Sequence, residues 1–259
     1  MKLKIARLLS SYFMIQSILL IALTVFFKLP KYSLYAFFLF NFLWHLVIYF
    51  FLVSNTESFY KTETHEKLYD INLANCISLF RASAVMPIGF LIWHSQNRSI
   101  LLWAVGYSIL IFLSDALDGF VARTHHETTQ LGKMIDSMSD YALLIFMSAL
   151  FYEMKILPLW FFILLFIRFF IQAYGMVKFL ALGFPMKPQS SIGGKITIAS
   201  TMFLYFFALI SMLLRIELFT KLVGIFTIVC AILIFVFLFE KLFLFFKHWK
   251  SYKQEKRQA

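Results

Sequence analysis

The chain has 259 residues, of which 61% are hydrophobic and 14% are charged, and its mean hydropathy is +0.82. Such a chain has too little polar surface to cover a water-soluble globule, so a soluble domain is excluded. The formal charge of +11 does not indicate nucleic-acid binding, because the basic residues stand at the ends of apolar segments and in the C-terminal tail. Their position favours contact with the anionic headgroups of a lipid bilayer.

The chain begins with a short basic segment and two apolar runs, at residues 8–27 and 33–53. A cleaved signal peptide is the alternative for the first run, but no small-residue cleavage site follows and the second run begins almost at once. We therefore predict a hairpin of two transmembrane helices over residues 1–53. Residues 54–71 form the one sustained polar segment, and their mixed charges favour a solvated or interfacial helix that acts as a cytoplasmic linker.

Six further apolar segments predict a helical domain over residues 72–246, followed by a basic tail at 247–259. Pro87 should kink the first of these segments. A loop containing glycine and proline, at residues 183–195, should separate the last two spans from the rest. The expected spans of this domain are 72–93, 100–123, 132–153, 157–182, 196–214 and 219–246. The sequence thus predicts an all-α polytopic integral membrane protein of about eight spans, with a two-helix hairpin before a six-helix core.

The even number of spans places both termini on the same side of the membrane. Under this topology most of the 24 lysines and arginines lie on the side of the termini. The positive-inside rule then predicts that the termini face the cytoplasm, in a cytoplasmic membrane. The same topology places the acidic residues between positions 115 and 140 at the cytoplasmic surface.

Four of the five aspartates of the chain lie within residues 115–140. Asp115 and Asp118 are three positions apart, and Asp136 and Asp140 are four apart, so each pair lies on one face of a helix. Two such faces joined by a short connection would bring four carboxylates together. Close carboxylates repel one another unless cations lie between them, and Mg²⁺ and Mn²⁺ prefer oxygen ligands of this kind. The spacing therefore predicts a site for divalent metal ions.

The same segments resemble the signature of the CDP-alcohol phosphotransferase family, which is matched at every defining position by Asp115-x2-Asp118-Gly119-x2-Ala122-Arg123-x8-Gly132-x3-Asp136-x3-Asp140. The resemblance covers residues 72–246 and implies the six-helix core. An Asn/Thr/Arg pattern common in the family is similar to Asn75-x2-Ser78-x2-Arg81. In a later loop the family often reads Ser-x2-Gly-Lys-x-Lys-Thr, and this chain is one position short there, with Ser191-Ile-Gly-Gly194-Lys195-Ile-Thr197.

The resemblance implies transfer of a substituted phosphate from a CDP-linked donor, usually CDP-diacylglycerol, to a small alcohol with release of CMP. It implies two divalent metal ions, Mg²⁺ or Mn²⁺, and the metal ligands it implies are Asp115, Asp118, Asp136 and Asp140. Asp140 would also be the general base that takes the proton of the attacking hydroxyl. The implied residues for nucleotide and donor binding are Asp115, Gly119, Ala122, Arg123 and Gly132. A homodimer is a further expectation from the resemblance.

The residues expected to bind the acceptor are Arg81, Arg168 and Lys195. An arginine inside an apolar segment is costly and usually faces a polar cavity, although Arg81 and Arg168 could instead be buried structural partners and Lys195 a solvated side chain. A basic pocket favours glycerol 3-phosphate as the acceptor. However, the family's glycerophosphate enzymes often have Asp-Pro where this chain has Asp136-Ser, so serine, inositol phosphate and choline stay open.

A protein of another class, a cation or proton-coupled transporter, would also carry carboxylates inside a membrane. Transporters commonly place such carboxylates near the midplane of the bilayer and often contain internal repeats. In this sequence the carboxylates gather at one expected surface, and no repeat is visible. The pattern therefore favours the enzyme.

Overall fold

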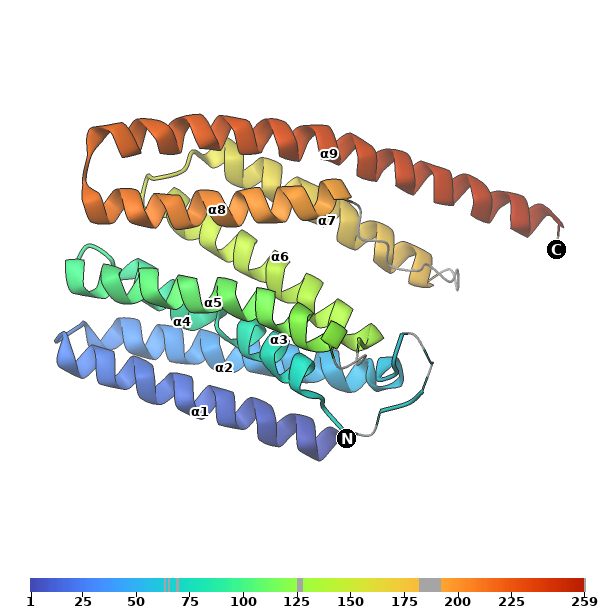
Figure 1. Cartoon of the computed structure of the whole chain (residues 1–259), viewed down its shortest axis with the longest axis horizontal. Helices are drawn as coiled ribbons and strands as arrows, with labels where there is room; N and C mark the ends of the chain where they lie inside the picture. Colours follow the sequence, from blue (N-terminus) through green and yellow to red (C-terminus); the bar gives the residue numbers. More distant parts are fainter. Residues whose placement is uncertain (63, 65, 69, 125–127, 182–191, 259) are drawn as a thin grey trace. The chain divides into compact units, whose positions relative to one another are not determined.

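The structure is a computed structural model that describes the whole chain except residues 63, 65, 69, 125–127, 182–191 and 259. The described residues form helices, and their only β-type pairs are isolated bridges. The chain divides into two compact units, Met1–Phe146 and Met147–Ala259, and each is described by itself (Figure 1). The prediction of an all-α protein is confirmed.

The described residues of the first unit form five α-helices, one short 3₁₀ helix and most of a sixth α-helix, which Figure 1 labels. In order along the chain they are α1 (Lys2–Phe26), α2 (Lys31–Ser54), η1 (Thr56–Ser58), α3 (Leu73–Ser83), α4 (Val85–Trp93), α5 (Arg98–Thr124) and α6 (Gln130–Glu153). Helices α1 and α2 pack together as a hairpin. Their turn has Lys28 at a positive φ of 51°, and the N–H of Leu29 donates to the carbonyl of Thr24 at 2.9 Å. This capping bond ends α1 with a left-handed residue and lets the chain reverse.

The expected third span is interrupted at Ala84, where α3 ends and α4 begins. Pro87 lies in the first turn of α4, and a proline ring clashes with the carbonyl four residues earlier, here that of Ser83. The interruption therefore lies where the proline forbids a continuous helix. The indole N–H of Trp44 on α2 donates to the carbonyl of Ala82 at 2.7 Å, so the hairpin satisfies a carbonyl near the interruption.

One apolar cluster joins the N-terminal hairpin to α3 and to the start of α6. It contains the buried side chains Ile5, Leu9, Ile48, Leu52, Phe59, Leu79, Ala82, Leu131 and Ile135. Helix α3 also accepts a bond from α1, because the hydroxyl of Tyr12 donates to the carbonyl of Cys76 at 3.0 Å. The hairpin and the polar segment after it thus pack against α3 and against the start of α6, the helix that carries Asp136 and Asp140.

The polar segment after α2 differs from the solvated or interfacial helix predicted for it. Apart from η1, its described residues form no helix, and they pair instead with the start of α6. The N–H of Thr62 donates to the carbonyl of Thr128 at 2.8 Å, and the N–H of Gln130 donates to the carbonyl of Tyr60 at 3.2 Å. These bonds satisfy backbone groups that a helix would have paired within itself, and such long-range pairing is not visible in a local charge pattern.

The part of the second unit that the structure describes contains the end of α6 and the helices α7 (Leu159–Ala181), α8 (Ile192–Leu214) and α9 (Glu217–Gln258) (Figure 1). Helix α9 packs against both α7 and α8. A side chain on Gly193 would place its Cβ 2.1 Å from Cδ1 of Phe237, so the close approach of α8 and α9 requires glycine there. Most of the predicted loop at 183–195 lies outside the described residues, and Lys195 belongs to the first turn of α8.

Seven helical segments among the described residues are long and apolar enough to cross a membrane, and α3 and α4 count together as one. The remaining expected span, at 157–182, corresponds to α7, whose described apolar part is Leu159–Gly175. The prediction of a polytopic membrane protein is therefore confirmed.

Candidate metal centre

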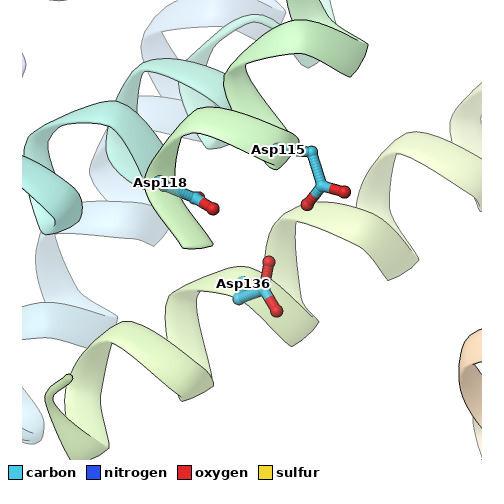
Figure 2. A group of neighbouring side chains, drawn as sticks. All are labelled: Asp115, Asp118 and Asp136. Atoms are coloured by element: carbon cyan, nitrogen blue, oxygen red, sulfur yellow. The ribbon is translucent and has the colours of Figure 1, made fainter. Parts of the chain in front are cut away.

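Three carboxylates from two helices point toward one another (Figure 2). Asp115 and Asp118 lie near the end of α5, and Asp136 lies near the start of α6. One oxygen from each of the three lies within 4.8 Å of the others. The spacing of three residues places the first pair on one face of α5, and the following helix brings the third carboxylate opposite them.

Asp140 lies one turn further along α6 and is buried, with 7% of its surface exposed. Its Oδ1 accepts no hydrogen bond among the described residues. The four aspartates differ in access, because the side chains of Asp115 and Asp136 are nearly half exposed, whereas those of Asp118 and Asp140 are each 10% exposed. The group therefore has an open side and a buried side.

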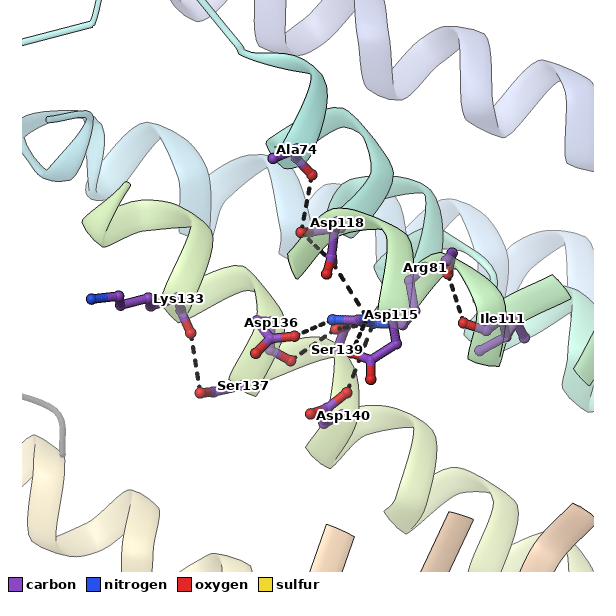
Figure 3. Close-up of polar contacts among 12 residues, drawn as sticks. Ala74, Arg81, Ile111, Asp115, Asp118, Lys133, Asp136, Ser137, Ser139 and Asp140 are labelled. Atoms are coloured by element: carbon purple, nitrogen blue, oxygen red, sulfur yellow. Dashed lines mark hydrogen bonds and ion pairs between the residues drawn. The ribbon is translucent and has the colours of Figure 1, made fainter. Parts of the chain in front are cut away.

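Arg81 on α3 lies among these carboxylates and is fully buried (Figure 3). Its Nη1 pairs with Asp115 and lies 3.4 Å from Oδ2 of Asp118. Its Nη2 pairs with Asp136, and its Nε lies 3.7 Å from Oδ1 of Asp140. The sequence suggested that Arg81 binds the acceptor, but in the structure its guanidinium contacts all four aspartates.

Two serines also make polar contacts with the group. The hydroxyl of Ser78 donates to Oδ2 of Asp118 at 2.6 Å, and Nε of Arg81 donates to Oγ of Ser139 at 3.1 Å. Ser78 precedes Arg81 by three residues, so the two side chains lie on the same face of α3. This spacing is visible in the sequence and indicates that Ser78 lies near the same site. Ser139 carries no such signal, because its role depends on an arginine from another helix.

The start of α6 packs closely against α3 at Gly132. Thr129 precedes the helix, and its Oγ1 accepts from the N–H of Gly132 at 2.9 Å, which is an N-cap interaction. The same hydroxyl donates to Oδ1 of Asn75 at 3.0 Å. A Cβ on Gly132 would lie 2.5 Å from Oδ1 of Asn75 and 2.8 Å from Oγ1 of Thr129. The absence of a side chain at Gly132 therefore sets how near α6 approaches α3, one turn before Asp136.

We expect Gly132→Ala to lower activity by roughly 10²-fold, because the added methyl would push α6 away from α3 and displace Asp136. The matched control is Gly106→Ala on α5, where an added Cβ meets no atom within 4 Å. The control should retain activity. Enzymatic activity of both variants would be compared at equal amounts of folded protein, and equal activities would contradict the role of Gly132.

The other residues expected at the donor site lie beside the carboxylates on α5. Gly119 and Ala122 are half-buried and Arg123 is exposed. Nη1 of Arg123 would lie 3.1 Å from a Cβ on Gly119, so the guanidinium lies over this glycine. The side of the helix next to Asp115 thus combines small residues with an exposed guanidinium, a combination that suits phosphate binding.

Arg168 and Lys195 belong to the second unit. Arg168 on α7 is 1% exposed and lies over the ring of Phe169, with 5.4 Å between its Cζ and the ring centroid. Lys241 on α9 lies near enough for its charge to interact with that of Arg168. Lys195 is exposed. Glu240 also lies near enough to interact with Lys241 and carries the opposite charge. Of Arg168, Lys241 and Glu240, the sequence pattern indicated only Arg168.

The aspartate group fits a hard divalent cation. All of its candidate ligands are carboxylate oxygens from adjacent helices, and the single guanidinium among them balances only one of four negative charges. The buried Oδ1 of Asp140, which accepts no hydrogen bond among the described residues, is a further acceptor for a cation or a proton.

The fold and the site define a helical membrane protein with a candidate divalent-metal centre near the ends of two neighbouring spans. The sequence profile described as CDP-alcohol phosphatidyltransferase matches residues 71–244, which is more than half of the chain. No curated protein matches the chain. The chain therefore belongs to the CDP-alcohol phosphatidyltransferase family, whose members are membrane transferases of phospholipid synthesis that use CDP-alcohols.

Proposed function

We propose that this enzyme transfers the phosphatidyl group of CDP-diacylglycerol to a small alcohol and releases CMP, with two divalent ions, Mg²⁺ or Mn²⁺, as cofactors. The observation that carries the proposal is the convergence of Asp115, Asp118 and Asp136 from α5 and α6, with Asp140 one turn away. These four residues would hold the metal ions. Bound metal supplies positive charge to the diphosphate, whose transferring and leaving oxygens gain negative charge during the reaction.

The chain's own residues then orient the two substrates. Arg123 lies beside Gly119 on the accessible side of α5, where its guanidinium would bind a phosphate of the donor. Gly119 and Ala122 have no bulky side chains, so the nucleotide could approach the backbone of α5 closely. Asp140 would take the proton of the attacking hydroxyl, and its Oδ1, which accepts no hydrogen bond among the described residues, supports this role.

For the acceptor we propose glycerol 3-phosphate, because a phosphorylated alcohol needs cationic partners. Arg168 and Lys195 are the proposed ligands, and the half-buried Lys241 near Arg168 adds a further cation within the same unit. Arg81 contributes less to this argument, since its guanidinium already contacts carboxylates. Serine, inositol phosphate and choline remain the competing acceptors.

The test is to incubate the purified full chain with CDP-diacylglycerol, metal and each acceptor in turn, and to identify the lipid product by mass spectrometry. We expect phosphatidylglycerol phosphate with glycerol 3-phosphate, and a higher KM for this acceptor in Arg168→Lys. A product formed only with serine, inositol phosphate or choline would replace the proposed acceptor while leaving the chemistry intact.

We also propose that the termini and the aspartate group face the cytoplasm. The prediction uses two exposed positions near opposite ends of α5, Thr124 and Gln96. In a background with Cys76 and Cys230 replaced by alanine, a cysteine at Thr124 should react with a membrane-impermeant thiol reagent only from the cytoplasmic side. A cysteine at Gln96 should react only from the opposite side, and the reverse pattern would overturn this orientation.

A further inference from the structure

The guanidinium of Arg81 connects two helices that carry like charges. Each of its three nitrogens faces a carboxylate, with Nη1 facing Asp115 and Asp118 on α5 and the other two facing Asp136 and Asp140 on α6 (Figure 3). Without a cation between them, four carboxylates in a membrane protein repel one another strongly. Arg81 therefore supplies a positive charge between the carboxylates of α5 and α6 and lets the two helices approach.

Two of the four aspartates stay accessible to solvent although Arg81 contacts them. The side chain comes from α3, is fully buried, and contacts one oxygen of each carboxylate. The side chains of Asp115 and Asp136 nevertheless stay nearly half exposed. A planar guanidinium fixes the direction of each partner, which a single ammonium charge does not. Arg81 thus contacts the four carboxylates from the α3 side. Three of them keep oxygens within 4.8 Å of one another, close enough to bind one metal ion.

The N-terminal hairpin keeps α3, and with it Arg81, in place. The side-chain amide of Gln16 on α1 donates to Oγ of Ser83 at 2.7 Å, and Trp44 on α2 donates to the carbonyl of Ala82 at 2.7 Å. Both acceptors lie within two residues of Arg81. Leu79 and Ala82 also pack into the apolar cluster shared with α1 and α2. The helices that precede the family's domain therefore support the helix that carries the guanidinium.

We propose that Arg81 is a positioning residue of the metal centre, which holds the four aspartates together before metal binds and sets their spacing as ligands. The inference rests on the proposed function, because it assumes that the aspartates bind divalent metal. It differs from the expectation that Arg81 binds the acceptor, since a guanidinium directed at four carboxylates is not directed at a phosphate. Mutation of a residue that bonds to metal ligands typically lowers metal affinity by about 10- to 100-fold.

The first test measures the melting temperature of the purified full chain, in EDTA and with increasing Mn²⁺. Wild-type protein should be stabilised by Mn²⁺, because a ligand that binds only the folded state raises its stability. Arg81→Met should melt at a lower temperature than wild type in EDTA, since the aspartates lose their counter-charge. Saturating Mn²⁺ should recover most of that loss, because the metal ions replace the missing charge.

The second test uses Arg81→Lys, which retains the charge but loses the planar geometry. We expect its half-saturating Mn²⁺ concentration, measured by thermal stabilisation and by activity, to rise about tenfold or more while the KM for the acceptor is unchanged. The control is Arg168→Lys, another arginine buried within a span, whose half-saturating Mn²⁺ concentration should equal that of wild type.

Each contrary result has a distinct meaning. If Mn²⁺ fails to stabilise even wild-type protein, the metal site of the proposed function is wrong. If wild type is stabilised but Arg81→Met loses as much stability with Mn²⁺ as without it, Arg81 serves only the fold and the inference is wrong. A higher acceptor KM in Arg81→Lys with unchanged Mn²⁺ dependence would also overturn it, because that result identifies an acceptor ligand.

Discussion

Chelation with EDTA is expected to abolish CMP release, and restored Mg²⁺ or Mn²⁺ should recover it. The physical reason is the charge of the aspartate group, in which four carboxylates face one guanidinium. The donor brings a further negatively charged diphosphate to this place, so the two could not approach without added positive charge.

The measurement is the rate of CMP release at fixed donor and acceptor, after exhaustive chelation and across a titration of each ion. A matched preparation treated with Ca²⁺-loaded EDTA controls for effects of the chelator on detergent and lipid. Full activity after exhaustive chelation would remove the metal from the mechanism.

Changing Asp140 to asparagine should lower kcat by about 10² to 10⁴ with little change in donor affinity. If Asp140 is the base, its loss removes proton transfer from the attacking hydroxyl, whereas Asp115, Asp118 and Asp136 would remain to hold metal and donor. The amide of asparagine has nearly the shape of the carboxylate, so the buried position should still pack.

The comparison for this variant is Asp136→Asn, on the same helix and one turn earlier. That change should weaken metal and donor binding, because a neutral amide offers one oxygen without the charge that balances a divalent ion. Donor binding and kcat would be measured for both variants at saturating metal. Near-normal kcat in Asp140→Asn, or a defect in donor affinity alone, would show that Asp140 is not the base.

The sequence predicted the helices and the aspartate group because both depend on local patterns. Apolar runs of about 20 residues define spans wherever the surroundings are lipid. The spacing of Asp115 from Asp118 is set by the helical repeat, and a short connection brings the next helix alongside. The fixed spacing of the motif also predicted the family, which the profile match confirms.

The contacts that depend on long-range packing were not predicted. The segment that follows α2 has the charge pattern of a helix, yet Thr62 pairs with Thr128, which is far away in sequence. Arg81 was recognised as costly inside a span, but its partners lie on two other helices. Local periodicity shows which face of a helix a residue occupies, and only the fold shows what that face meets.

The most direct test of the proposed enzyme is to measure CMP release and lipid product together, using purified protein, CDP-diacylglycerol, Mg²⁺ or Mn²⁺ and glycerol 3-phosphate. We predict that CMP and a new phospholipid form in equal amounts, that both need the acceptor, and that both are lost in the Asp140→Asn variant. No CMP release with glycerol 3-phosphate, serine, inositol phosphate or choline, under conditions where the protein is folded, would contradict phosphatidyl transfer and favour a transporter.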